Sequence, residues 1–348
     1  MKVSILTYHW EDNYGATMQA YATYKAIKQL GHSPEFIDLR LPYNPSLKSR
    51  LVFGLKRYRF NKFRQKYFRK RTPKIYWSVD ELRNNPPQSD CYLVGSDQTW
   101  NPQIGKELLP AFFLTFGDQS IKRISYATSI GLNKWEESPY ISNEDISKAL
   151  KHFNQILLRE NSGIRIAKEI FNAEAKQVID PVLLFPSYPE LTGEIKQTGE
   201  IITYKLINDE NFYENALTIA KDLNKPVRSI GSVRKPSGFR AAYPESVEDW
   251  VKRIAGSEIV ITDSFHGTVI SLLYHRQFVV YIGDSNRITR IVSLLSQLGL
   301  EERILTGKNS IEDIRDMALK KIDWTEIDSK LHNLRQNSLS LLSNAITH

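Results

Sequence analysis

The chain has 348 residues, of which 41% are hydrophobic and 25% charged, and it contains a single cysteine. This composition is typical of a soluble globular protein long enough for two domains, and it excludes disordered and fibrous classes. One cysteine excludes an intrachain disulfide and a cysteine-based metal knuckle. The apolar start of the chain stops after Leu6 and no stretch is long enough to span a membrane, so we expect a cytoplasmic protein.

The formal net charge is +8, but the positive charge is concentrated in one segment. Residues 48–71 contain eleven lysines and arginines and no acidic residue, and the rest of the chain is slightly acidic. A single basic segment is not the broad positive surface of a nucleic-acid-binding protein, so we expect no nucleic-acid partner.

The first half of the chain alternates between short apolar strands and amphipathic helices. Strands are predicted at 3–7, 35–38, 91–94, 123–127, 155–158 and 177–179, and helices at 16–30, 143–153 and 162–171. Prolines then interrupt the pattern, and residues 186–200 are predicted to form a linker. Strand–helix–strand alternation of this kind predicts a parallel α/β domain.

A second alternation follows the linker. Strands are predicted at 201–205, 226–230, 258–262 and 278–282, and helices at 211–223, 247–255, 268–274, 288–298 and 324–345. We therefore predict an N-terminal domain over 1–190, a C-terminal domain over 195–325, and a last helix in 326–348 that packs back on the N-terminal domain.

Polar residues at the predicted strand ends are the candidate functional residues, because ligands of parallel α/β sheets bind at the carboxyl ends of the strands. His266 and Gly267 follow one strand and precede a helix whose amino end would favour an anion. The alternative is a capped helix with a satisfied histidine. Arg159 ends another strand, where it could bind phosphate or carboxylate, or pair with Glu160 at a surface.

Two further loops combine small polar residues with an aromatic side chain, as carbohydrate sites often do. One follows the strand 91–94 and is predicted to contact a sugar through Ser96, Asp97, Gln98, Trp100 and Asn101. The alternative is a tight turn over a buried tryptophan. The other loop contains Asn13, Tyr14 and Gly15, which are predicted to contact a sugar for the same reason. The seven histidines never pair at metal-ligand spacing, so no metal site is expected.

Seven motifs, in order along the chain, resemble those of the polysaccharide pyruvyl transferases. They are Asn13-Tyr14-Gly15-Ala16 with Gln19-Ala20-Tyr21-Ala22; Val94 to Pro102; Ser125 to Gly131; Arg159-Glu160 with Ser162-Gly163-Ile164; Asp180 to Leu184; Thr262 to Thr268; and Asn286-Arg287 with Ser293-Leu294-Leu295, Leu298-Gly299-Leu300 and Arg303. Each motif alone is weak evidence for the family, but seven motifs in the family's order are specific.

The resemblance implies an α/β fold of two facing Rossmann-like domains, similar to the GT-B glycosyltransferases, with the donor between them. It implies transfer of the enolpyruvyl unit of phosphoenolpyruvate, as a cyclic ketal, to a sugar of a bacterial capsule, an exopolysaccharide or a lipid-linked precursor. Phosphoenolpyruvate would be a co-substrate, and no cofactor would be needed. The alternatives are a GT-B glycosyltransferase that uses a nucleotide sugar and a non-catalytic sugar-binding relative.

The resemblance also assigns residues. Arg159 and His266 match the family's donor-binding and catalytic pair, and the other donor-binding residues would be Ser264, Phe265, Gly267, Thr268, Asn286 and Arg287. Some family members carry arginine where this chain has Ser264, so Arg287 is expected to supply that cation. The loops that contain Asn13 and Ser96 would hold the acceptor.

Aromatic residues within the basic segment recur at helical spacing, at Phe53, Phe60, Phe63 and Tyr67. A basic amphipathic helix can bind an anionic membrane surface, which would place the enzyme at the inner face of the membrane beside a lipid-linked acceptor. The alternative is a helix that packs its aromatic residues on the first domain and leaves its bases in water.

Overall fold

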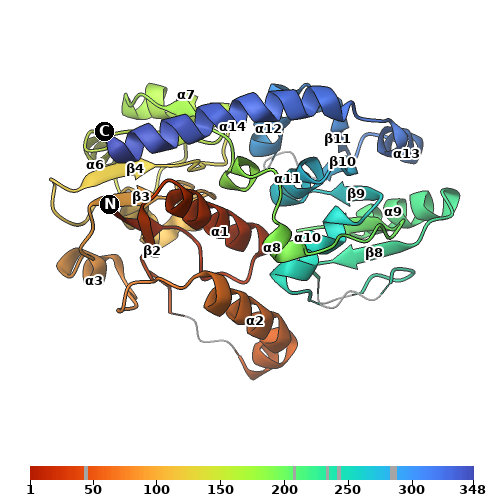
Figure 1. Ribbon diagram of the computed structural model, residues 1–348, viewed down its shortest axis with the longest axis horizontal. Helices are drawn as coiled ribbons and strands as arrows, with labels where there is room; N and C mark the ends of the chain where they lie inside the picture. The colour runs from red at the N-terminus through yellow and green to blue at the C-terminus, as the bar shows by residue number, and fades with distance from the viewer. Residues whose placement is uncertain (43–45, 207–208, 233–234, 241–243, 283–287) are drawn as a thin grey trace. The chain divides into compact units, whose positions relative to one another are not determined.

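The computed structural model describes residues 1–42, 46–206, 209–232, 235–240, 244–282 and 288–348 (Figure 1). The chain forms two compact units, each assembled from separate segments. Unit 1 comprises Met1–Asn44, Arg64–Leu184 and His332–His348, and unit 2 comprises Pro45–Phe63 and Phe185–Leu331. The domain boundaries predicted above assume continuous segments and stay a prediction.

Unit 1 is built on a parallel sheet in the order β2-β1-β3-β4. These strands are β1 (Lys2–Leu6), β2 (Ser33–Phe36), β3 (Cys91–Val94) and β4 (Lys122–Ser125). A parallel pair, β5 (Leu157–Leu158) and β6 (Lys176–Gln177), follows, and single bridges join β4 and the loop after it to the β5 region. β3 is buried throughout, as expected of a strand covered on both faces.

The helices of unit 1 are short except for α1 (Tyr14–Gln29), which directly follows the loop after β1. The others are α3 (Val79–Asn84), α4 (Pro102–Gly105), α5 (Leu109–Phe112), α6 (Asn143–Leu150) and α7 (Asn161–Phe171). Two longer helices, α2 (Leu47–Tyr67) and α14 (Trp324–Thr347), contribute residues to both units. The second half of α14 bonds to unit 1, where Ser338 Oγ accepts from the Ile179 N–H at 3.1 Å.

Unit 2 is built on a parallel sheet in the order β11-β10-β9-β7-β8. Its strands are β7 (Ile201–Tyr204), β8 (Val227–Ile230), β9 (Ile259–Thr262), β10 (Gln277–Ile282) and β11 (Ile304–Thr306). Its helices are α8 (Pro189–Thr192), α9 (Glu210–Asp222), α10 (Val247–Ala255), α11 (Phe265–Leu273), α12 (Thr289–Leu298) and α13 (Ile311–Leu319).

The two sheets share one topology. In each, the first strand lies between the second and the third, so the strand order reverses between β1 and β3 in unit 1 and between β7 and β9 in unit 2. Such a reversal sends successive connections to opposite faces and leaves an open crevice at the carboxyl ends of the two strands. The α/β, Rossmann-like class predicted from the sequence is confirmed.

Several elements differ from the sequence prediction. α11 begins at Phe265 instead of residue 268, because Ser264 accepts from the Gly267 N–H and caps the helix earlier. The predicted linker at 186–200 contains the short helix α8. The strand β11 and the helix α13 were not predicted from the hydrophobic pattern.

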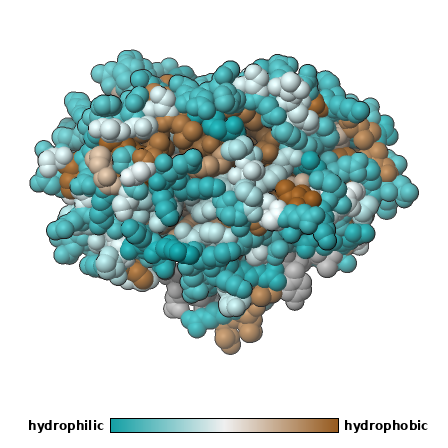
Figure 2. Space-filling model, in the orientation of Figure 1, coloured by the Kyte–Doolittle hydropathy of each residue, from teal (hydrophilic) through white to brown (hydrophobic). Residues whose placement is uncertain are grey.

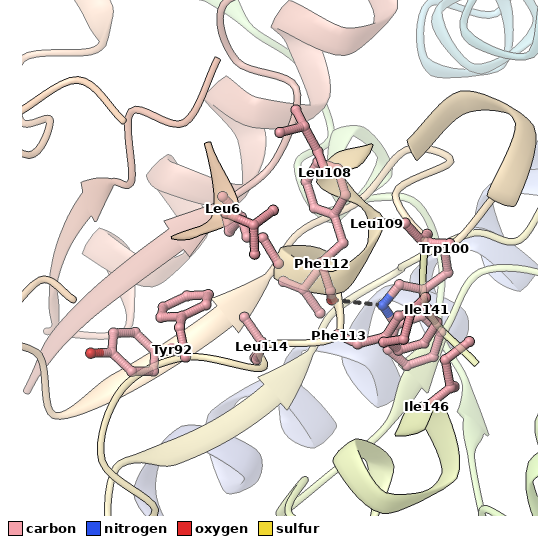
Figure 3. Close-up of a cluster of buried hydrophobic side chains, with 14 of the residues drawn as sticks. Leu6, Tyr92, Trp100, Leu108, Leu109, Phe112, Phe113, Leu114, Ile141 and Ile146 are labelled. Carbon is pink, nitrogen blue, oxygen red and sulfur yellow. Dashed lines mark hydrogen bonds between the residues drawn. The ribbon is translucent and has the colours of Figure 1, made fainter. Parts of the chain in front are cut away.

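The core of unit 1 contains a cluster of buried aromatic and aliphatic side chains (Figure 3). Trp100 is buried there, stacked on Phe113 with ring centroids 4.9 Å apart. Its Nε1 donates to the carbonyl oxygen of Phe112 at 2.9 Å. The buried indole therefore has its one polar group satisfied. A separate apolar cluster, which includes Ile201, Phe212 and Val279, forms the core of unit 2.

Candidate functional site

The first candidate loop follows β1 and leads into α1. Asn13 caps that helix, because its Oδ1 accepts from the Ala16 N–H at 3.1 Å. Asn13 is exposed, whereas Tyr14 and Gly15 are buried in the first turn. Of the three predicted acceptor residues in this loop, Asn13 is therefore the one whose side chain reaches solvent.

The second candidate loop follows β3, the strand adjacent to β1. Asp97 has a φ of +79°, a left-handed conformation that is uncommon for any residue except glycine. Backbone strain of this kind is stored most often at functional sites. Asp97 and Gln98 are partly exposed, and Gln98 Oε1 accepts from the side chain of Asn101 at 3.1 Å.

The remaining predicted residues of that loop are buried. Asn101 caps α4 through a 3.0 Å bond from the Gln103 N–H, and Ser96 Oγ donates to Asp180 at 3.1 Å. Trp100 lies in the core described above, so no sugar ring can stack on it without unfolding the loop. The structure thus matches the alternative interpretation of Trp100, a tight turn over a buried tryptophan.

Arg159 lies at the carboxyl end of β5, and its side chain is only 2% exposed. Its Nη1 donates to Asp180 Oδ2 at 2.6 Å and to Ser96 Oγ at 3.2 Å, and its Nη2 lies 3.9 Å from Asp97 Oδ1. The guanidinium therefore ties the segment after β6 to the loop after β3. A phosphate that binds through Nη1 of Arg159 would have to compete with Asp180.

Glu160, the next residue, is completely buried and holds a neighbouring turn. Its Oε1 accepts from Ser129 Oγ and from the N–H groups of Ile130 and Gly131, at 2.8–2.9 Å. Gly131 has a φ of +70°, and a Cβ there would lie 2.1 Å from Gln98 Oε1. The positive φ favours glycine in this turn. Because Glu160 bonds to the turn and Arg159 bonds to the loop after β3, the pair fixes two adjacent loops at the carboxyl edge.

Glu11 is a candidate that the sequence analysis missed. It lies in the loop after β1, and burial, together with the charges of Asp97 and Asp12, raises its pKa to about 7. Burial and the charges of Glu11 and Asp97 also raise the pKa of Tyr8. A carboxyl group with a pKa near neutrality can exchange a proton during a reaction. Its place in a polar loop directly after a buried strand was the available signal.

In unit 2, the motif Thr262 to Thr268 forms the end of β9 and the first turn of α11. Ser264 caps the helix, and Thr268 Oγ1 donates to the Ser264 carbonyl oxygen at 3.0 Å. A Cβ at Gly267 would lie 2.7 Å from Thr262 Oγ1, so packing against β9 already requires glycine at this position. Ser264, Gly267 and Thr268 therefore form the helix start that carries His266.

His266 lies in the first turn of α11 and is 6% exposed. Its ring meets the Phe265 ring edge to face, with centroids 5.2 Å apart. The guanidinium carbon of Arg290, from the first turn of α12, lies 5.7 Å from the centroid of the Phe265 ring. The structure therefore brings a histidine, an aromatic ring and an arginine together at the start of α11, and Arg290 was not predicted from the sequence.

A second cation, Lys205, follows β7, the strand next to β9 where the strand order reverses. The side chain of Lys205 is 3% exposed, and its Nζ lies 3.0 Å from Asp263 Oδ2 and 3.7 Å from Asp209 Oδ2. Asp263 Oδ1 also accepts from the Leu206 N–H at 2.9 Å. Lys205 thus joins the loop after β7 to the loop after β9. The predicted donor residues Asn286 and Arg287 lie outside the described residues.

The fold resembles those of a UDP-GlcNAc 2-epimerase and a glycotransferase. The structure titled "Methanocaldococcus jannaschii UDP-GlcNAc 2-epimerase in complex with UDP-GlcNAc and UDP" has a TM-score of 0.54 and 13% identity, over 92% of this chain and 94% of that chain. The glycotransferase of kitacinnamycin has a TM-score of 0.51 and 10% identity, over 99% of both chains. At these identities the likeness shows the fold alone, and it defines a GT-B-like α/β protein.

A family model is more specific than the fold. The model for polysaccharide pyruvyl transferase matches residues 13–285, which is most of the chain. The chain therefore belongs to the polysaccharide pyruvyl transferase family and is a transferase by membership. A comparison with curated proteins finds no match.

Removal of the Arg159 guanidinium tests its structural role. We expect Arg159→Ala to lower the free energy of unfolding by about 3–5 kcal/mol, because Asp180 is left buried without its cation. Denaturant unfolding measures this loss. Arg165→Ala on the exposed face of α7, where Arg165 pairs with Glu169 at 3.5 Å, is the control and should be nearly neutral. Equal stability of the two variants would refute the network.

The raised pKa of Glu11 makes stability depend on pH. Since the folded-state pKa lies above the unfolded value of about 4.3, stability falls as the pH rises from roughly 4.3 to 7 and the loss persists above that range. Glu11→Gln removes this loss, so its melting temperature should exceed that of the wild type by more at pH 8 than at pH 4. Calorimetry at both values measures the difference, with exposed Glu107→Gln as the control. A gain independent of pH would contradict the assignment.

Proposed function

We propose that the protein transfers the enolpyruvyl unit of phosphoenolpyruvate to two hydroxyl groups of one sugar and forms a cyclic pyruvate ketal. Both C–O bonds form at the central carbon of the donor, and its bond to the phosphate oxygen breaks. Of the two hydroxyl protons, one balances the proton gained by the methylene carbon and the other leaves with the phosphate. Family membership supports the transfer, and the His266 turn at the start of α11 is the observation that carries it.

The donor half of the proposal rests on unit 2. His266 would give the proton to the methylene carbon or assist the departing phosphate. Arg290 and the amino end of α11 would balance the charge of the carboxylate and the phosphate. Ser264, Gly267 and Thr268 would hold that helix start in place. Asn286 and Arg287 stay proposed donor contacts.

The acceptor half rests on the carboxyl edge of unit 1. Asn13, Asp97 and Gln98 are the predicted residues whose side chains reach solvent there, and they offer hydrogen bonds to a sugar. Glu11, with its pKa near 7, would accept a proton from an attacking hydroxyl. We propose that Arg159 positions Asp97 through the pair between its Nη2 and Asp97 Oδ1, while its Nη1 stays bonded to Asp180.

We propose that the acceptor is a sugar of a bacterial capsule, an exopolysaccharide or a lipid-linked precursor, and that the reaction is cytoplasmic and needs no cofactor. The competing candidate is a glycosyltransferase that uses a nucleotide sugar, which the GT-B-like fold favours. The two differ in the donor that the protein binds and in the group it releases. A non-catalytic sugar-binding relative would release neither.

Replacement of the histidine tests the chemistry. His266→Ala should lower acceptor-dependent phosphate release from phosphoenolpyruvate by about 10²–10⁴-fold, the usual contribution of a general acid or base. A coupled phosphate assay with a panel of glycan acceptors measures the rate. The control is His332→Ala, since His332 is exposed on α14. Near-normal turnover of a correctly folded His266→Ala protein would overturn the assignment.

Ligand-induced stabilisation tests the donor. A ligand that binds only the folded protein stabilises it by about 2.7 kcal/mol at a hundredfold excess over its dissociation constant. Phosphoenolpyruvate should therefore raise the melting temperature of the wild type, and Arg290→Gln should lose most of that rise. UDP- and GDP-sugars should cause none. A larger rise with a nucleotide sugar would favour the glycosyltransferase instead.

A further inference from the structure

The first half of α2 carries a stripe of exposed apolar side chains. Leu47, Leu51, Leu55 and Tyr58 follow one another at spacings of four, four and three, which places them on one face of the helix. They are 74%, 78%, 40% and 65% exposed. Figure 2 shows hydrophobic residues over the first turns of α2. We call these four residues the outer stripe.

The outer stripe differs from the aromatic stripe found in the sequence. Phe60 and Phe63, which belong to the aromatic stripe, are buried, and Tyr67 packs on Tyr21 with ring centroids 5.1 Å apart. In the second half of the segment, the aromatic side chains therefore pack on the protein, as the alternative interpretation of the sequence expects. Phe53, the aromatic residue in the first half of α2, is 44% exposed. The outer stripe lies on the opposite face of the helix from Phe60 and Phe63, so their burial does not explain it.

Some bases of the segment are paired and others are exposed. Arg64 is buried and bonds to Asp12 at 2.7 Å, and Arg71 lies 3.9 Å from Asp38. Lys48, Arg50 and Lys62, on the same helix as the outer stripe, are exposed. Residues 46–62 contain six bases and no acid. The outer stripe is thus an exposed apolar surface bordered by positive charge.

Charge complementarity identifies what this surface fits. A second copy of the chain would bring six further bases against these six, which opposes self-association. An anionic lipid surface offers negative headgroups for the bases and an acyl boundary for the apolar residues. Lysine and arginine stems bury along such a boundary while their charges stay in water. No helix within the described ranges is long and apolar enough to cross a bilayer.

We propose that residues 47–62 form a peripheral docking surface for anionic membranes, in which the outer stripe enters the headgroup region and the exposed bases contact the lipid phosphates. This surface is separate from the donor and acceptor residues proposed above. The docking can therefore fail without affecting the proposed function, because it is measured with no substrate present.

Sedimentation with vesicles tests the proposal. Wild-type protein should sediment with vesicles that contain phosphatidylglycerol, less so at high salt, and hardly at all with pure phosphatidylcholine. Leu51→Gln with Tyr58→Gln should reduce binding through loss of apolar contact. Lys48→Gln with Lys62→Gln should weaken binding about tenfold or more. The matched control, Lys308→Gln with Lys321→Gln, removes two exposed charges outside α2 and should bind nearly as well as the wild type.

Three results would overturn the proposal. The first is a wild type that does not sediment with anionic vesicles. The second is equal weakening by the Lys48/Lys62 pair and by the control pair, since binding would then depend on net charge alone. The third is a wild-type dimer in analytical ultracentrifugation that the Leu51/Tyr58 variant disrupts, because the outer stripe would then be an interface between copies. Every variant should keep the wild-type circular dichroism spectrum and melting temperature.

Discussion

Parallel strands end at the same edge of a sheet, and this constraint decides where the functional residues of the protein can gather. In unit 1 the strand order reverses between β1 and β3, and the loops that follow these strands hold Glu11, Asn13 and Asp97. In unit 2 it reverses between β7 and β9, and the corresponding loops hold Lys205 and lead to His266. One topology, used twice, therefore places acidic side chains at one carboxyl edge and the turn that carries His266 at the other.

A buried cation holds the loops together at each of the two edges. Arg159 is surrounded by Asp180, Ser96 and Asp97, and a buried cation of this kind stabilises only when carboxylates satisfy it. Lys205 has the same relation to Asp263 and Asp209. Arg159 and Lys205 hold the loops in register. Arg290 is a further cation, and it lies beside the Phe265 ring. Rigid loops would suit the proposed reaction, in which two hydroxyls must reach one carbon.

The sequence predicted the strands that carry the sites more reliably than it predicted the roles of single residues. The strand at 91–94 coincides with β3, because a continuous apolar run between polar loops leaves few alternatives. Trp100 and Gly267 have roles that depend on tertiary neighbours, Phe113 in one case and Thr262 in the other, so their local sequence could not separate packing from ligand binding. Glu11 and Arg290 lie outside the motifs, and only folding places them beside Asp97 and Phe265. The outer stripe of α2 was obscured by the aromatic residues on its opposite face.

We propose that a three-carbon donor, and not a nucleotide sugar, supplies the transferred group. Mass spectrometry of a glycan acceptor panel incubated with the wild-type protein and phosphoenolpyruvate distinguishes the two donors. We expect an acceptor that gains the mass of pyruvate less one water, with one phosphate released for each product. Addition of a whole sugar residue from a nucleotide sugar, with no product from phosphoenolpyruvate, would contradict it.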